Sequence, residues 1–160
     1  MFTKFNTTIK VTAVLSLVLF VALSTAWAVE TYIASKIIRK GGTSDRLITV
    51  ADTAEGSVNF RIKAGALDDY LTEQGKGRVK ITVDMMKDEE NGVLLFTFGP
   101  SGAHFDPPAK LKLRGEFIMD DYLLLDENGE ILECTAAPKK DLVVFEIPHF
   151  SSYYYDDYDY

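Results

Sequence analysis

The stretch RVKITVDMMKDEENGVLLFTF, from Arg78 to Phe98, decides the fold class. Every second residue in its first half is apolar: Val79, Ile81, Val83 and Met85. A period of two residues is the pattern of a half-buried β-strand, because successive side chains of a strand point to opposite faces. Asn91-Gly92 follows, and this dipeptide readily adopts the positive φ angles of a tight turn. The stretch therefore predicts two antiparallel strands joined by a hairpin.

The same signals recur on both sides of this hairpin. Asp126-Glu127-Asn128-Gly129 separates the runs YLLL and EILEC and predicts a second hairpin. Further strands are expected in four runs: RLITVAD (46–52), SVNFRIK (57–63), AKLKLRG (109–115) and DLVVFEI (141–147). One helical turn is expected in GALDDYLTEQG (65–75). Many short strands separated by turns are typical of a β-sandwich. We therefore expect an all-β fold with a single antiparallel β-sandwich.

The N-terminus has the pattern of a secretory signal peptide. Lys4 and Lys10 precede an apolar core, Val11 to Leu23, and Ala26-Trp27-Ala28 supplies small residues around a cleavage point. The alternative is a retained membrane anchor, since a run of about 20 apolar residues can span a bilayer. The core here is shorter and contains hydroxyl side chains. We expect cleavage after Ala28 and a secreted, periplasmic or cell-surface protein without further membrane association.

The rest of the chain is expected to form one domain with short ends. Residues 29–44 are expected as a lead-in helix or extended arm that Gly41-Gly42 ends. The sandwich would span 45–155, and 156–160 would form an acidic, tyrosine-rich tail. Removing Lys4 and Lys10 lowers the formal net charge from −7 to −9. Nucleic acid is therefore not an expected partner, because its phosphates would be repelled.

Cys134 is the single cysteine, so an internal disulfide cannot form. In the expected strand EILECTA it is predicted to be a small buried side chain, and the neighbouring Glu133 disfavours a reactive thiolate. DENGE (126–130) starts like a calcium loop but lacks the length and the later glutamate of an EF-hand, which favours a hairpin. We expect no cofactor.

Two stretches carry a more specific signal than alternation. FTFGPSGAHFDPPAKLKL, from Phe96 to Leu113, has Phe-Gly-Pro, Gly, Phe, Pro-Ala and Leu in that order. VVFEIPHFSSY, from Val143 to Tyr153, is a strand followed by His-Phe-Ser and an aromatic residue. Together they resemble the ZU-five domain family, the β-sandwich of ankyrins, netrin receptors and tight-junction scaffolds, and especially its exported bacterial relatives. The resemblance spans about Leu47 to Tyr155.

The resemblance implies a binding module and, as an alternative, self-cleavage. Most such domains bind proteins, as that of ankyrin binds spectrin, but one branch cuts its own chain between Phe and Ser, here Phe150 and Ser151. In that chemistry Ser151 Oγ attacks the Phe150 carbonyl while a base takes its proton. His104 and His149 are the two histidines, so an imidazole base would be one of them. We favour the interpretation in which Phe150 fills the core.

The C-terminal residues are the remaining candidate ligands. Exposed tyrosines are frequent in protein interfaces, and the candidate contact residues are Tyr153, Tyr155, Tyr158 and Tyr160. Calcium could be bound weakly by three carboxylates, Asp156, Asp157 and Asp159. A chain end binds metal poorly unless another loop completes the ligand shell, so the alternative is a solvated tail.

The expected function is an exported, non-enzymatic binding or structural module. Its partner would be an unidentified protein at the cell envelope or outside the cell. One alternative is the autoproteolytic domain that cleaves between Phe150 and Ser151. The other is a self-associating subunit of a surface assembly, in which residues 29–39 or the tyrosine tail donate a strand to the sheet edge of a neighbour.

Overall fold

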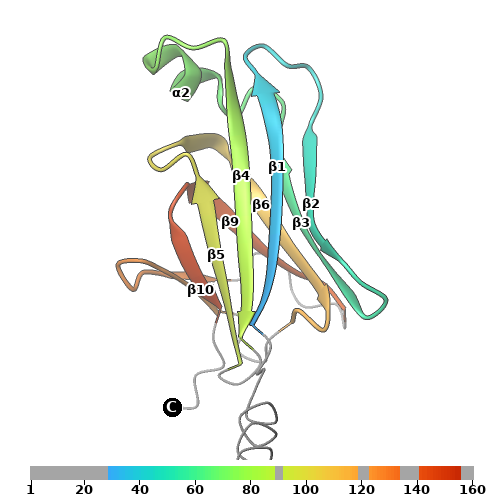
Figure 1. The fold of residues 1–160 in the computed structure, drawn as a ribbon. Helices are drawn as coiled ribbons and strands as arrows, with labels where there is room; N and C mark the ends of the chain where they lie inside the picture. Colours follow the sequence, from blue (N-terminus) through green and yellow to red (C-terminus); the bar gives the residue numbers. More distant parts are fainter. Residues whose placement is uncertain (1–28, 89–91, 119–122, 134–140, 156–160) are drawn as a thin grey trace, which may run out of the picture.

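The computed structural model describes residues 29–88, 92–118, 123–133 and 141–155, which form two antiparallel sheets packed face to face (Figure 1). The six-stranded sheet has the order β1 (Val29–Arg39), β4 (Arg78–Asp88), β5 (Val93–Gly99), β10 (Ser152–Tyr155), β7 (Leu123–Asp126) and β8 (Ile131–Glu133). The four-stranded sheet has the order β2 (Arg46–Asp52), β3 (Gly56–Ile62), β6 (His104–Gly115) and β9 (Val143–His149). The expected all-β sandwich is confirmed.

Helix α2 (Asp68–Glu73) lies at one end of the sandwich, here called the α2 end (Figure 1). It occupies the segment that the sequence predicted for a helical turn. Its residues Tyr70 and Leu71 are buried, so this short helix covers the end of the core. Within the described part of the chain, no helix has the length and apolar character needed to cross a membrane.

Both predicted hairpins are confirmed by strand pairing. β4 and β5 pair from Asp88 opposite Val93 to Thr82 opposite Gly99. β7 and β8 pair with Leu125 opposite Ile131. The alternating residues of β4 are buried as predicted, with Ile81, Val83 and Met85 in the core and Val79 packed against it. The period of two therefore identified these strands correctly.

Residues 29–39 are not a lead-in arm, and the sandwich begins before residue 45. They form β1, which pairs with β4 from Val29 opposite Asp88 to Arg39 opposite Arg78. Ile38 is buried, while Ile33 and Ile37 are exposed on the other face. Apolar residues thus occur on both faces of β1, which obscures its period. β1 belongs to the chain's own sheet along its whole length.

Phe150 fills the core, as favoured from the sequence. Its side chain is 3% exposed. Three rings surround it: Phe105 at 4.7 Å, Phe98 at 5.7 Å and Phe60 at 6.1 Å between centroids. These rings come from β6, β5 and β3, so they join the two sheets. Aromatic pairs at such separations contribute beyond their buried area.

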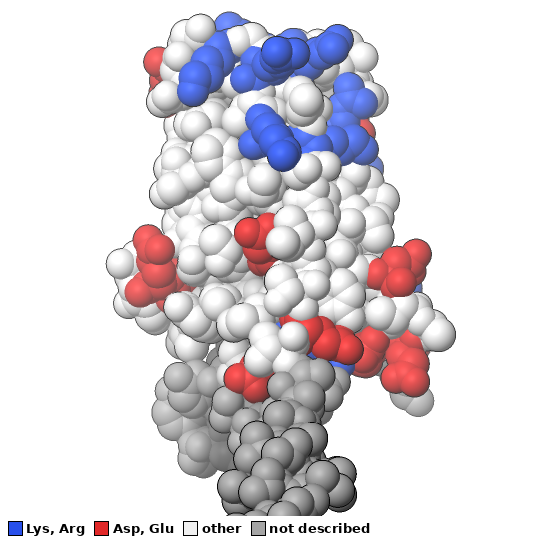
Figure 2. Space-filling view, in the orientation of Figure 1, with Lys and Arg blue, Asp and Glu red and all other residues white. Residues whose placement is uncertain are grey.

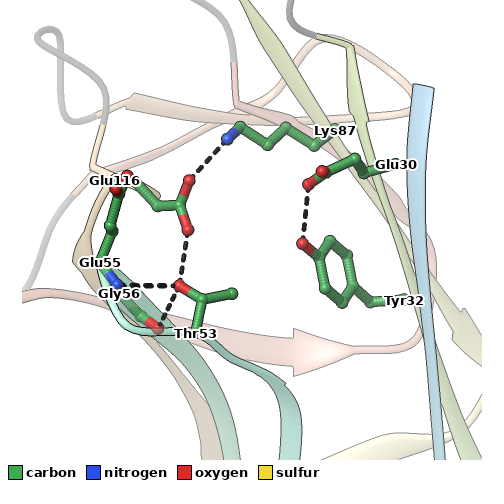
Figure 3. A network of polar contacts seen from close by, with 7 residues as sticks. All are labelled: Glu30, Tyr32, Thr53, Glu55, Gly56, Lys87 and Glu116. Carbon is green, nitrogen blue, oxygen red and sulfur yellow. Dashed lines mark hydrogen bonds and ion pairs between the residues drawn. The ribbon is translucent and has the colours of Figure 1, made fainter. Parts of the chain in front are cut away.

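A polar network joins the two sheets at the end opposite α2 (Figure 3). Lys87 Nζ of β4 lies 2.8 Å from Glu116 Oε2, and Glu116 Oε1 accepts a hydrogen bond of 2.6 Å from Thr53 Oγ1. Thr53 Oγ1 in turn accepts from Gly56 N at 3.0 Å. The hydrogen bonds from Lys87 and Thr53 lower the pKa of Glu116. The network therefore connects β4 to the turn between β2 and β3.

Candidate functional site

The fold brings both histidines to one place but gives their imidazoles different partners. His104 starts β6 and lies opposite His149, the last residue of β9. His149 Nδ1 lies 3.4 Å from Tyr153 Oη. His104 Nε2 lies 3.8 Å from Glu73 Oε1, and its ring packs edge-on against Tyr70. Each imidazole thus faces a neighbour other than Ser151.

Ser151 Oγ is buried and has no hydrogen-bond partner among the described residues. A serine nucleophile needs a base within hydrogen-bond reach, and neither imidazole occupies that position here. The backbone around it has a structural role. Phe150 N donates to Ala103 O at 2.7 Å, and Ser151 O accepts from Phe98 N at 3.2 Å. Self-cleavage between Phe150 and Ser151 stays a prediction without a supporting contact.

The prediction that Tyr153 and Tyr155 contact a partner is wrong, because both side chains are fully buried. Phe150 and Ser151 are consecutive buried residues between β9 and β10, and they shift the alternation of the last strand. Tyr154 is the outward-facing tyrosine and is 42% exposed. The remaining candidates lie outside the described residues: Tyr158, Tyr160, Asp156, Asp157, Asp159 and Cys134.

Tyr153 holds the corner between β9 and β10. Its hydroxyl donates to His149 O at 2.9 Å, and its ring lies edge-on to Phe98 at 5.7 Å. Burial raises the pKa of Tyr153 well above its usual range, and the carboxylates of Asp126 and Glu127 act in the same direction. A hydroxyl that stays protonated in this way is a hydrogen-bond donor for the fold.

Asp126 uses its carboxylate to close the β7–β8 turn. Its Oδ1 accepts from Asn128 N and from Glu130 N, each at 2.8 Å. Burial alone would raise the pKa of Asp126, but these two N–H groups and the Asn128 amide outweigh it and hold the pKa below its ordinary value. Among the described residues, no three His, Cys, Asp or Glu side chains are grouped to hold a metal ion.

Acid should weaken this hairpin through Asp126. A carboxylate with a lowered folded-state pKa stabilises the fold above the unfolded pKa of about 4, and this contribution is lost as the pH falls through the folded pKa. We expect the free energy of unfolding to fall less between about pH 5 and about pH 2 in Asp126→Asn than in the unmodified protein. Chemical denaturation at each pH measures the two slopes. Equal slopes would contradict the prediction.

An apolar row crosses the outer face of the six-stranded sheet. Successive neighbours in the strand register are Thr31, Met86, Leu95, Tyr154, Leu125 and Ile131, here called the outer row. Met86, Tyr154 and Ile131 are exposed large hydrophobic residues. Leu95 and Leu125 are partly exposed between them. The row thus presents apolar side chains to solvent on every strand except the edge strand β1, which contributes a threonine.

Charge is unevenly distributed on the same face. Arg39, Arg78 and Lys80 are exposed at the α2 end. Figure 2 shows most of the visible Lys and Arg gathered at that end, most of the Asp and Glu in the other half, and a largely uncharged surface between them. Asp84 lies opposite Ile33 and Thr97, and its Oδ1 is buried without a hydrogen-bond partner among the described residues. The face therefore combines a charged border with an apolar row.

The outer face of the four-stranded sheet has a different character. A shallow hollow of about 340 Å³ is lined by Asp45, Arg61, Lys63, Lys110 and Lys112. Arg61 pairs with Asp45 at 2.6 Å, and Lys110 pairs with Glu146 at 3.3 Å. The hydrogen bond from Ala64 N, followed by that from Arg61, lowers the pKa of Asp45. This face is polar, as expected for an antiparallel sheet that meets water on one side.

The chain matches no family model, no curated protein and no solved structure. The resemblance to the ZU-five family therefore stays a prediction that rests on the two quoted motifs. The outer row was missed from the sequence. Its only local signals are the apolar runs VLLF (93–96) and LLL (123–125), in which both faces of a strand are apolar.

Proposed function

We propose that this chain is an exported, non-enzymatic binding module that holds a protein partner on the outer face of its six-stranded sheet. The observation that carries the proposal is the outer row, in which apolar side chains of β4, β5, β10, β7 and β8 lie side by side. Contiguous exposed apolar surface with a charged border is typical of a protein interaction site. Aromatic residues and methionine, here Tyr154 and Met86, are enriched in such interfaces.

The contrast between the two sheets supports this choice of surface. The outward residues of β3 and β6 include Asn59, Arg61, Lys110 and Lys112, which suit contact with water. From β4 to β8 the outer row has no polar side chain of this kind, so the exposure of its apolar residues needs another explanation. The N-terminal stretch Lys4 to Ala28 supports export, because it has the composition of a signal peptide. The partner would then be met at the cell envelope or outside the cell.

A charged double variant in the outer row tests the proposal. Met86→Lys with Tyr154→Lys should reduce capture of envelope proteins from the producing organism by about tenfold or more, because a charged side chain in the interface core must be desolvated. The matched control is Leu47→Lys, since Leu47 is 49% exposed on β2 outside the row. Quantitative mass spectrometry of the captured proteins is the measurement, with circular dichroism to verify folding. Capture of the same proteins in the same amounts by the unmodified protein, the double variant and the control would refute the proposal.

Self-cleavage is the alternative from the enzyme class. It would require Ser151 Oγ to reach an imidazole that the described structure holds elsewhere, by Tyr153 or by Glu73. The intact mass of the purified protein distinguishes the two functions. A chain that ends at Phe150, and that becomes full length in Ser151→Ala, would establish the alternative. A stable full-length chain would leave the binding module as the proposal.

A further inference from the structure

β1 is an exposed edge strand with few of the usual protections against pairing. β4 is its hydrogen-bonded neighbour among the described strands, and the eleven residues Val29–Arg39 pair with it without a shift in register. Ile33 is 73% exposed and Ile37 is 55% exposed. Natural edge strands are usually short, bulged or interrupted by proline, because a long regular edge accepts another strand. β1 is long, is regular and contains no proline.

The sequence of β1 is also complementary to itself when it is reversed. In VETYIASKI (29–37), an antiparallel pairing centred on Ile33 places Val29 opposite Ile37, Glu30 opposite Lys36, Thr31 opposite Ser35, Tyr32 opposite Ala34, and Ile33 opposite itself. Opposite charges, hydroxyl pairs and β-branched pairs are the combinations that stabilise neighbouring antiparallel strands. Every position of the nine-residue stretch therefore meets a compatible side chain.

This register is distinguished from its neighbours by the charged pair. Moving the centre to Ala34 places Lys36 opposite Tyr32 and Glu30 opposite Ile38. Moving it to Tyr32 places Glu30 opposite Ala34 and leaves Lys36 without a partner residue in β1. Centring the pairing on Lys36 would oppose two like charges, which destabilises a strand pair. The centre at Ile33 is the one that pairs Glu30 with Lys36 twice, once on each side of the axis.

Both charged side chains keep the capacity for this contact. Glu30 Oε2 accepts from Tyr32 Oη at 2.7 Å (Figure 3), which leaves its second carboxylate oxygen for another donor. Lys36 Nζ donates to Leu47 O at 2.9 Å, and an ammonium group has three donors. Both side chains are exposed. The pair could therefore form across a strand interface without breaking either existing hydrogen bond.

We propose that two copies of this chain associate through antiparallel pairing of β1 with β1, around a two-fold axis at Ile33. The pairing joins two six-stranded sheets into one continuous sheet and leaves every strand in its own chain. A two-fold interface of this kind is closed, because each copy uses the same surface. It therefore produces a dimer and not a filament, and it uses the edge of the sheet, which is a different surface from the outer row.

Charge reversal on β1 tests the dimer and its register. Analytical ultracentrifugation of the purified protein at several concentrations should show a monomer–dimer equilibrium. Lys36→Glu places two carboxylates opposite each other and should raise the dissociation constant by about tenfold or more. The double variant Glu30→Lys with Lys36→Glu restores opposite charges in the same register and should recover most of the lost affinity. Lys112→Glu, the same charge reversal on β6 of the four-stranded sheet, should leave the equilibrium unchanged.

Two results would overturn this inference. One is a monomer at every concentration up to the millimolar range. The other is a dimer that Lys36→Glu does not weaken or that the double charge reversal does not restore, since it would then use another surface or register. Ile33→Lys provides a second variant, because it opposes two lysines at the axis and should also favour the monomer. The thermal unfolding midpoint of each variant verifies that the monomer stays folded.

Discussion

Replacing Phe150 with alanine is expected to lower the free energy of unfolding by about 3–5 kcal/mol, the usual range for a buried phenylalanine. The ring packs against Phe60, Phe98 and Phe105, which come from both sheets. Its removal would leave a cavity where the two sheets meet, and a cavity lined by large rings on regular strands can collapse only in part. Chemical denaturation of the two proteins measures the difference.

Tyr154→Ala is the control for Phe150→Ala. Tyr154 lies on the adjacent strand β10 and is 42% exposed, so its truncation should cost about 1 kcal/mol or less. Similar losses for the two variants would mean that Phe150 is not an anchor of the core. The result also bears on the role of the His-Phe-Ser segment. A large loss of stability in Phe150→Ala would mean that this segment is a marker of the fold, although its residues resemble a cleavage site.

Gly115→Ala is expected to lower the free energy of unfolding by about 3 kcal/mol, from backbone strain together with a steric clash. Gly115 has a φ of 61°, in the left-handed region. It lies opposite Gly56, and an added Cβ would overlap the carbonyl oxygen of Glu55. The turn that holds Thr53 and its hydrogen bonds would have to move away from the end of β6.

Gly129→Ala separates the two contributions. Gly129 has a φ of 79°, but an added Cβ would have no atom within 4 Å. It should therefore cost only the left-handed strain, about 1–2 kcal/mol. Equal losses in the free energy of unfolding for the two variants, measured by chemical denaturation, would show that the turn from Thr53 to Gly56 can move away from β6 at little energetic cost. A larger loss at Gly115 would confirm that this turn is fixed against β6.

Strands with one polar face could be predicted from the sequence, and strands with two apolar faces could not. β4 alternates cleanly, so the sequence predicted correctly that Ile81 and Val83 share its buried face. β1 was missed because Ile33 and Ile37 are apolar on the solvent side. In β10 three consecutive tyrosines carry no alternation, and the buried pair Phe150-Ser151 sets which of them face inward.

The candidate site depended on information that no local pattern contains. The outer row takes one residue from each strand of the six-stranded sheet, and its members become neighbours only through the strand order and register. Tyr154 and Met86 are 68 positions apart in the chain. The edge of β1 is the opposite case, because its self-complementary pattern is local. That pattern could be recognised only after residues 29–39 were known to form an edge strand.

Because the outer row runs perpendicular to the strands, binding of the proposed partner would depend on how completely the chain has folded. Thr31 belongs to the first strand and Tyr154 to the last, so partial unfolding that frees either strand interrupts the surface. A partner that contacts the whole row would bind the folded state selectively and would stabilise the six-stranded sheet against unfolding. At a concentration a hundredfold above its dissociation constant, such a ligand adds about 2.7 kcal/mol to the free energy of unfolding.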